Sequence, residues 1–127
     1  MTQTTATQLS TIGQIAMVAK DVARATAFYR DQLGMKFLFE FPGLAFFDCG
    51  GVRLMISKAE KPEFDHPGSV LYFKVDGIQK AHDDLKARGV EFVEPPHLIA
   101  KLPDHELWMA FFRDSEGNTL ALMEERR

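Results

Sequence analysis

The hydrophobic pattern along the chain runs through the same cycle twice. An extended apolar run meets Asp21, passes through a helix-length stretch that stops at Gly34, and resumes as an alternating strand. The second cycle reaches Asp76 and stops at Gly89, so the two cycles superpose when the chain is shifted by 55 residues, the separation of Asp21 and Asp76. A repeat that occurs only twice indicates one duplicated module, because a solenoid needs at least three units.

Each cycle predicts a strand, a helix and three further strands, and helices beside antiparallel strands make the fold class α+β. Asp21 and Asp76 are expected to cap their helices, since a carboxylate can accept from the free N–H groups of a first turn. Pro95 and Pro96 are expected to end regular pairing of their strand. The strands are expected at 12–19, 35–40, 44–49, 52–57, 70–75, 90–94, 107–113 and 119–124, and the helices at 22–33 and 77–88.

Length and composition predict one soluble domain. The chain has 127 residues, of which 46% are hydrophobic and 26% charged, as in ordinary globular domains. A net charge of −3 provides no basic surface for nucleic acid or a membrane. A single cysteine excludes an internal disulfide and favours a cytoplasmic location. We expect a flexible N-terminal tail at 1–10 and one domain at 11–127, with modules at about 11–58 and 69–125 joined by a linker at 59–68.

The period of two along the strands separates two faces. One face is entirely apolar and is expected to form the core under the helices. It carries Ile15, Met17, Leu54, Ile56, Leu71, Phe73, Val75, Leu120 and Leu122. The other face mixes small, flexible and polar groups, which suits the lining of a cavity and would equally suit a dimer contact or a partly wet sheet face. It carries Gln14, Ala16, Arg53, Met55, Ser57, Val70, Tyr72, Lys74, Thr119, Ala121 and Met123.

Two strings of residues carry a resemblance to a known family. The run from Gln14 to Asp21, followed by the Phe28-Tyr29-x-x-x-Leu33-Gly34 string, resembles the opening of vicinal oxygen chelate proteins, and 111–118 resembles their closing string. This superfamily includes glyoxalase I, bleomycin-resistance proteins, extradiol dioxygenases and methylmalonyl-CoA epimerase. The resemblance spans 12–125. It implies two tandem βαβββ modules whose curved mixed sheets form a cup.

The resemblance also implies where a metal would be held. Superfamily enzymes place divalent-ion ligands on the first and last strands of each module, which correspond here to Gln14, Met55, Val70 and Ala121. Only Gln14 matches a residue that some glyoxalase I enzymes use. Valine and alanine have no donor atom, and a thioether suits soft ions such as Cu(I). We therefore expect no metal and no cofactor, and the chain looks more like the bleomycin-resistance branch, which keeps the fold and sequesters a small molecule.

The leading hypothesis is a metal-free homodimer that binds a small, partly apolar organic molecule able to carry a negative charge. Arg53 is the sharper candidate within the cup, as a clamp for a carboxylate or phosphate or, alternatively, as a surface ion-pair partner. Trp108 is expected either in the core or as an aromatic wall of the cup. The expected ligand-binding residues are Gln14, Arg53, Met55, Val70, Tyr72, Trp108, Ala121 and Met123.

Two other hypotheses remain open. A metal-independent lyase, isomerase or epimerase would use His105 or Glu106 as general base. Alternatively, a collapsed cup would leave a protein that acts through its surface. A substitute metal site at Asp104, His105 and Glu106 with His97 is disfavoured, because neighbouring side chains on an extended segment point to opposite sides.

Overall fold

The structure is a computed structural model that describes residues 7, 10–59 and 68–127, and it forms two four-stranded sheets with a helix on each. The predicted boundaries at 1–10 and 59–68 fall largely outside the described residues and stay predictions. The elements are β1 (Gln14–Val18), α1 (Val22–Ala27), a π-helical turn η1 (Phe28–Gln32), β2 (Lys36–Phe41), β3 (Leu44–Cys49), β4 (Val52–Ser57), β5 (Leu71–Lys74), α2 (Ile78–Ala87), β6 (Glu91–Lys101), β7 (Glu106–Arg113) and β8 (Thr119–Arg126).

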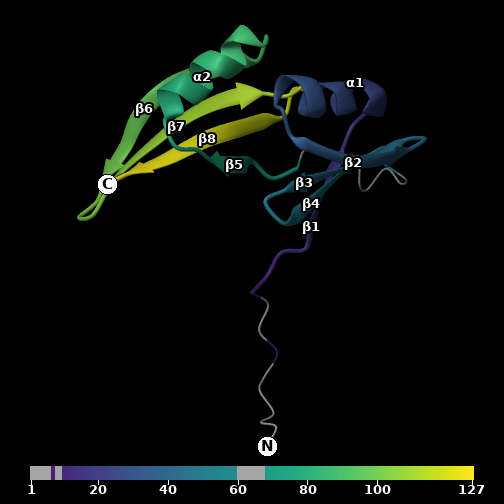
Figure 1. Cartoon of the computed structure of the whole chain (residues 1–127), viewed down its shortest axis with the longest axis horizontal. Helices are drawn as coiled ribbons and strands as arrows, with labels where there is room; N and C mark the ends of the chain where they lie inside the picture. Colours follow the sequence, from purple (N-terminus) through teal and green to yellow (C-terminus); the bar gives the residue numbers. More distant parts are fainter. Residues whose placement is uncertain (1–6, 8–9, 60–67) are drawn as a thin grey trace, which may run out of the picture.

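The two sheets have the same topology, which confirms the tandem α+β modules. The first has the strand order β1-β4-β3-β2 and the second has β5-β8-β7-β6. In each sheet the first and last strands of the module pair in parallel, and the other pairs are antiparallel. Figure 1 shows α1 and α2 on the same side of the two sheets, so the opposite face of each sheet is free of helices.

One core joins both modules on the helix side of the sheets. Its largest fully buried side chains include Tyr29, Phe47 and Leu54 from the first module and Phe112 and Leu120 from the second. The apolar face predicted from the period of two is therefore the core face.

A buried hydrogen-bond network centred on Asp114 links the modules. The Tyr29 hydroxyl donates to Asp114 Oδ2 over 2.8 Å, and the backbone N–H groups of Glu116 and Asn118 donate to Oδ1 over 2.9 and 2.8 Å. The Asn118 side-chain amide donates to Oδ2 over 2.9 Å. Burial and the neighbouring Asp114 carboxylate raise the pKa of Tyr29, so its hydroxyl remains a proton donor. The hairpin between β7 and β8 is thus fixed against a side chain of η1.

The entry to α1 is satisfied from both modules. Asp21 accepts from the N–H of Arg24 over 3.0 Å, which confirms the predicted cap. The Glu116 carboxylate also accepts from the N–H groups of Lys20 and Asp21 over 2.7 and 3.3 Å. The predicted helix then continues through a π-helical turn, where the N–H of Leu33 donates to the carbonyl of Phe28.

The predicted cap at Asp76 is wrong. Gly77 occupies the position before α2 with a φ of 80°, a left-handed conformation that glycine adopts without strain. The carboxylate of Glu124 on β8 accepts from the N–H groups of Gly77 and Ile78 over 2.7 and 3.0 Å. A side chain distant in sequence therefore satisfies these donors, which local spacing could not indicate.

Regular pairing breaks at Pro95 and Pro96 as predicted, but the strand expected to end at Glu94 is longer than predicted. The strand β6 continues through both prolines to Lys101. Its register against β7 shifts three times, between Phe92 and Glu94, between Glu94 and His97, and at Leu98. Because β6 is the edge strand of its sheet, proline residues without an N–H are tolerated at these irregularities.

Replacement of Tyr29 by Phe tests the link between the modules. The Tyr29→Phe variant loses a hydrogen bond to a buried carboxylate, and we expect the free energy of unfolding to fall by about 2 kcal/mol. Urea unfolding measures this loss. Tyr72→Phe is the control, because that hydroxyl is on an exposed side chain and should matter by less than about 0.5 kcal/mol. Equal stability of Tyr29→Phe and the unmodified protein would contradict the proposed role.

The carboxylate cap of α2 predicts a specific acid dependence. Hydrogen bonds from the backbone of Gly77 and Ile78 lower the pKa of Glu124. The stabilisation that the Glu124 carboxylate provides is therefore complete above its unfolded-state pKa of about 4.3. This stabilisation is lost as the pH falls through the pKa of the folded state. We expect Glu124→Gln to be less stable by about 1 kcal/mol at neutral pH, and the difference to shrink as the pH falls further below the unfolded value of about 4.3. Urea unfolding at neutral pH and at a series of acid pH values checks this, and a difference independent of pH would contradict it.

Candidate ligand-binding site

The open face of the first sheet gathers three of the predicted site residues. Gln14 on β1 is the register partner of Arg53 on β4, and Met55 lies two residues further along β4. The Gln14 side-chain amide faces the Met55 sulfur at 3.8 Å. Gln14 and Arg53 are exposed, and Met55 is half-buried. These side chains thus share one accessible surface, as the period of two predicted.

Aromatic side chains that the sequence analysis did not include complete this surface. The guanidinium of Arg53 lies over the ring of Phe46 at 5.7 Å from its centre, a cation–π arrangement. Phe39 packs on Phe46 at a centroid distance of 4.8 Å and contacts Phe41 at 5.6 Å. Phe39 and Phe41 are 43% and 58% exposed, so two aromatic rings beside a guanidinium face solvent.

The sequence could have predicted the face on which one of these three aromatic residues lies, but not the face of the other two. The turn at 50–51 makes Cys49 and Val52 register partners. Counting away from the turn along both strands then pairs Phe46 with Met55. Phe46 could therefore have been assigned to the open face. Phe39 and Phe41 reach this face only because the register of β2 shifts between Phe37 and Phe39, and nothing in the alternation marks that shift.

The open face of the second sheet holds the other predicted group. Tyr72 on β5 is the register partner of Ala121 on β8, and the ring of Tyr72 meets Phe111 edge-on at a centroid distance of 6.2 Å. Val70 precedes β5 and Met123 follows Ala121 by two residues on β8. Ala121 is fully buried, while Tyr72 is 48% exposed. The predicted site residues thus form two groups on separate sheets. The contact of Gln14 with Met55 and the contacts among aromatic rings described above each join residues of a single sheet.

Trp108 faces the helix side of the second sheet and not its open face. It shares the phase of Ala110 and Phe112, which are buried in the core. Its indole N–H donates to the Glu106 carboxylate over 3.0 Å, and the guanidinium of Arg126 lies 4.5 Å from its ring centre. Of the two alternatives for Trp108, the structure therefore favours packing against the core. Glu106 lies on the same side.

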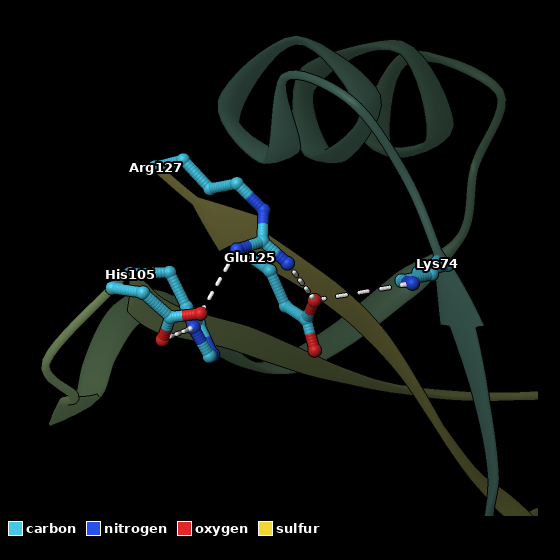
Figure 2. Close-up of polar contacts among 5 residues, drawn as sticks. Lys74, His105, Glu125 and Arg127 are labelled. Carbon is cyan, nitrogen blue, oxygen red and sulfur yellow. Dashed lines mark hydrogen bonds and ion pairs between the residues drawn. The ribbon is translucent and has the colours of Figure 1, made fainter.

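A charged cluster lies where the open face of the second sheet ends (Figure 2). His105 Nδ1 lies 2.8 Å from Asp104 Oδ1, and Arg127 Nη1 contacts Asp104 Oδ2 at 3.0 Å. Glu125 lies 3.7 Å from Arg127 and 3.9 Å from Lys74. The His105 ring and the Arg127 guanidinium hold the pKa of the Asp104 carboxyl below its usual value. A carboxylate thus orients His105, whose side chain is only 14% exposed.

The positions that correspond to metal ligands do not suit a hard or borderline divalent ion. Gln14 offers one amide, Met55 a thioether, and Val70 and Ala121 nothing, whereas such ions take about four or more N, O or S donors. Within the described ranges, no three His, Cys, Asp or Glu side chains converge as a ligand set.

Comparison with known proteins identifies the family. Residues 11–122 match the model of the Glyoxalase/Bleomycin resistance protein/Dioxygenase superfamily. The chain belongs to this superfamily. The resemblance to vicinal oxygen chelate proteins inferred from the sequence is therefore confirmed.

Individual proteins are similar to this chain over most of their length. A glyoxylase-like domain-containing protein from Didymella fabae is 30% identical over 125 residues, which cover 87% of this chain and 91% of the relative. The uncharacterized protein YraH of Bacillus subtilis is 28% identical over 126 residues, covering 86% and 94%. The crystal structure of lactoylglutathione lyase from Agrobacterium tumefaciens superposes with a TM-score of 0.65 at 26% identity, over 92% of this chain and 95% of that one. Among the described residues of this superfamily member, no helix is long and apolar enough to cross a membrane.

Proposed function

We propose that this superfamily member binds a small, partly apolar organic molecule on the open sheet faces without the family metal. The observation that carries the proposal is the placement of Arg53 over Phe46, beside the exposed rings of Phe39 and Phe41. A cation held next to exposed aromatic surface matches a ligand with an apolar body and an anionic group.

The lack of an ion pair between Arg53 and any described carboxylate supports a role as an anion clamp. Asp48 is its register partner on β3, yet the described residues contain no ion pair to Arg53. The Asp48 carboxylate instead accepts from the N–H of Gly51 over 3.0 Å. The guanidinium therefore keeps its fork of donors for a carboxylate or phosphate. This favours the clamp over the alternative of a surface ion pair.

The donor chemistry of the four ligand positions supports binding without a metal. Lewis-acid polarisation of a substrate requires a bound ion, and a lone amide with a thioether is a poor site for one. Neither Met55 nor Ala121 can take a proton, so these positions supply no general base. The proposed activity is sequestration of a ligand, as in the branch of the superfamily that this chain resembles.

We also propose a cytoplasmic homodimer. The open faces carry exposed apolar side chains on both sheets, including Phe41 at 58% and Tyr72 at 48% exposure. Exposed apolar area of this kind marks a ligand or partner surface. A cup requires the two faces to meet, either within one chain or between the modules of two chains.

The Arg53→Ala variant tests the proposed ligand site. In a thermal-shift screen of aromatic acids, thiol conjugates and glycopeptide antibiotics, a bound ligand should raise the melting temperature by mass action. For an anionic ligand we expect Arg53→Ala to weaken binding about tenfold or more, because a hydrogen-bonded charge pair is lost. Arg24→Ala on α1 removes a comparable exposed arginine from the helix side and should bind normally.

Two results would contradict the proposal. An unchanged shift in Arg53→Ala for an anionic ligand would remove the clamp. A ligand shift that appears only after addition of stoichiometric Ni²⁺ or Zn²⁺ would show that binding depends on a metal.

A second candidate function is metal-independent acid–base catalysis by His105. The specific observation is the 2.8 Å contact between His105 Nδ1 and Asp104. If Nδ1–H donates to this carboxylate, Nε2 keeps the lone pair that a general base needs. The indole of Trp108 already donates to Glu106 on the helix side, which makes His105 the better candidate of the two.

Paired substitutions test the second candidate against a measured turnover. We expect His105→Ala to lower kcat by about 100-fold or more if His105 is the base. Glu106→Gln is the control and should retain kcat, since its side chain points away from the open face. Normal kcat in His105→Ala would exclude His105, and a large loss in Glu106→Gln alone would assign the base to Glu106.

A further inference from the structure

An apolar crevice lies at the junction of the modules on the helix side of the second sheet. Its volume is about 290 Å³. It is lined by eight apolar residues and two charged ones, namely Leu33, Met35, Phe73, Val75, Ala81, Asp84, Leu85, Arg88, Phe112 and Leu122. Leu33 and Met35 come from the first module and the rest from the second, so both modules form its walls.

This crevice is separate from the open faces. Phe73 and Leu122 line the crevice, while their neighbours Tyr72 and Ala121 belong to the open face of the same strands. Successive side chains of a strand point to opposite sides of the sheet. A molecule in the crevice therefore contacts none of the residues proposed to bind the ligand of the open faces.

The charges at the crevice are unbalanced in favour of an anion. Asp84 is already paired with Lys80 across 2.9 Å. Arg88 Nη1 donates to the carbonyl of Gln32 over 3.3 Å, and the described residues provide no acidic partner for its guanidinium. Arginine in this state presents further N–H donors with the planar geometry that matches a carboxylate.

We propose that this crevice is a second binding site, for a small monocarboxylic acid with an aryl or short alkyl body. The apolar body packs among Phe73, Leu85 and Phe112, and the carboxylate binds Arg88. The volume fits this class, because an apolar cavity of about 150 Å³ holds one benzene molecule. Twice that space accommodates a phenyl ring with a short chain and its carboxylate.

The position of the site gives binding a structural consequence. A ligand that contacts Met35 and Leu85 at once adds apolar contacts between modules that otherwise meet there across a gap. Binding to the folded state alone raises the stability of the whole chain. Occupancy of the crevice should therefore stabilise the arrangement of the two modules.

Phenylpropionate and its neutral amide, phenylpropanamide, are suitable probes for calorimetry and for NMR shifts of backbone amides. We expect millimolar or tighter binding of the acid, with shifts at Leu33, Leu85 and Arg88. Arg88→Gln should weaken the acid about tenfold and leave the amide within about twofold, because only the acid uses the charge. Ala81→Leu fills the crevice and should abolish binding of both probes.

Two controls separate this site from its surroundings. Lys86→Gln removes one positive charge from α2 without touching the crevice, and Arg53→Ala removes the proposed clamp of the open face; neither should change binding of phenylpropionate. Melting curves confirm that each variant is folded. No binding at millimolar concentration, shifts confined to Tyr72 and Met123, or equal affinity of Arg88→Gln for the acid would each overturn the proposal. If Arg53→Ala does not change binding of the open-face ligand, the proposed open-face clamp fails, but the proposal of a site in the crevice stands.

Discussion

The arrangement of the two modules depends on one buried carboxylate. Asp114 is only 8% exposed, and a buried charge is tolerated only when hydrogen bonds replace its water. Tyr29 of the first module provides one of these bonds. The backbone N–H groups of Glu116 and Asn118 and the side chain of Asn118, in the same hairpin as Asp114, provide the others. The same hairpin places Glu116 at the entry of α1. The turn, the first helix and the module contact are therefore one unit.

Much of the fold follows from two periodicities. The cycle that repeats at Asp21 and Asp76 predicted tandem modules, and the period of two predicted which strand residues enter the core. These predictions succeed because apolar burial acts on every residue of a strand, so the signal accumulates. The caps show the limit. Asp21 is a local cap and was predicted, whereas Glu124 reaches α2 from 46 residues further along the chain.

The candidate site was predictable to a similar extent. The alternation of β1, β4, β5 and β8 placed Gln14, Arg53 and Tyr72 on the open faces. It could not assign Trp108, because a tryptophan suits a core and a cavity wall equally well. It also missed Phe39, whose orientation depends on a register shift. No pattern in the sequence predicted the crevice beside Arg88, because it exists only where side chains of both modules fail to fill the space between them.

The irregular pairing of β6 has a consequence for assembly. Edge strands expose unpaired backbone groups that recruit further strands from other molecules. In β6, Pro95 and Pro96 remove two N–H donors, and the successive shifts in register break the regular spacing of those that remain. This border of the second sheet is thus a poor template for strand addition and for fibril growth. Any oligomer of this protein that continues a sheet from one molecule into the next must use a different border.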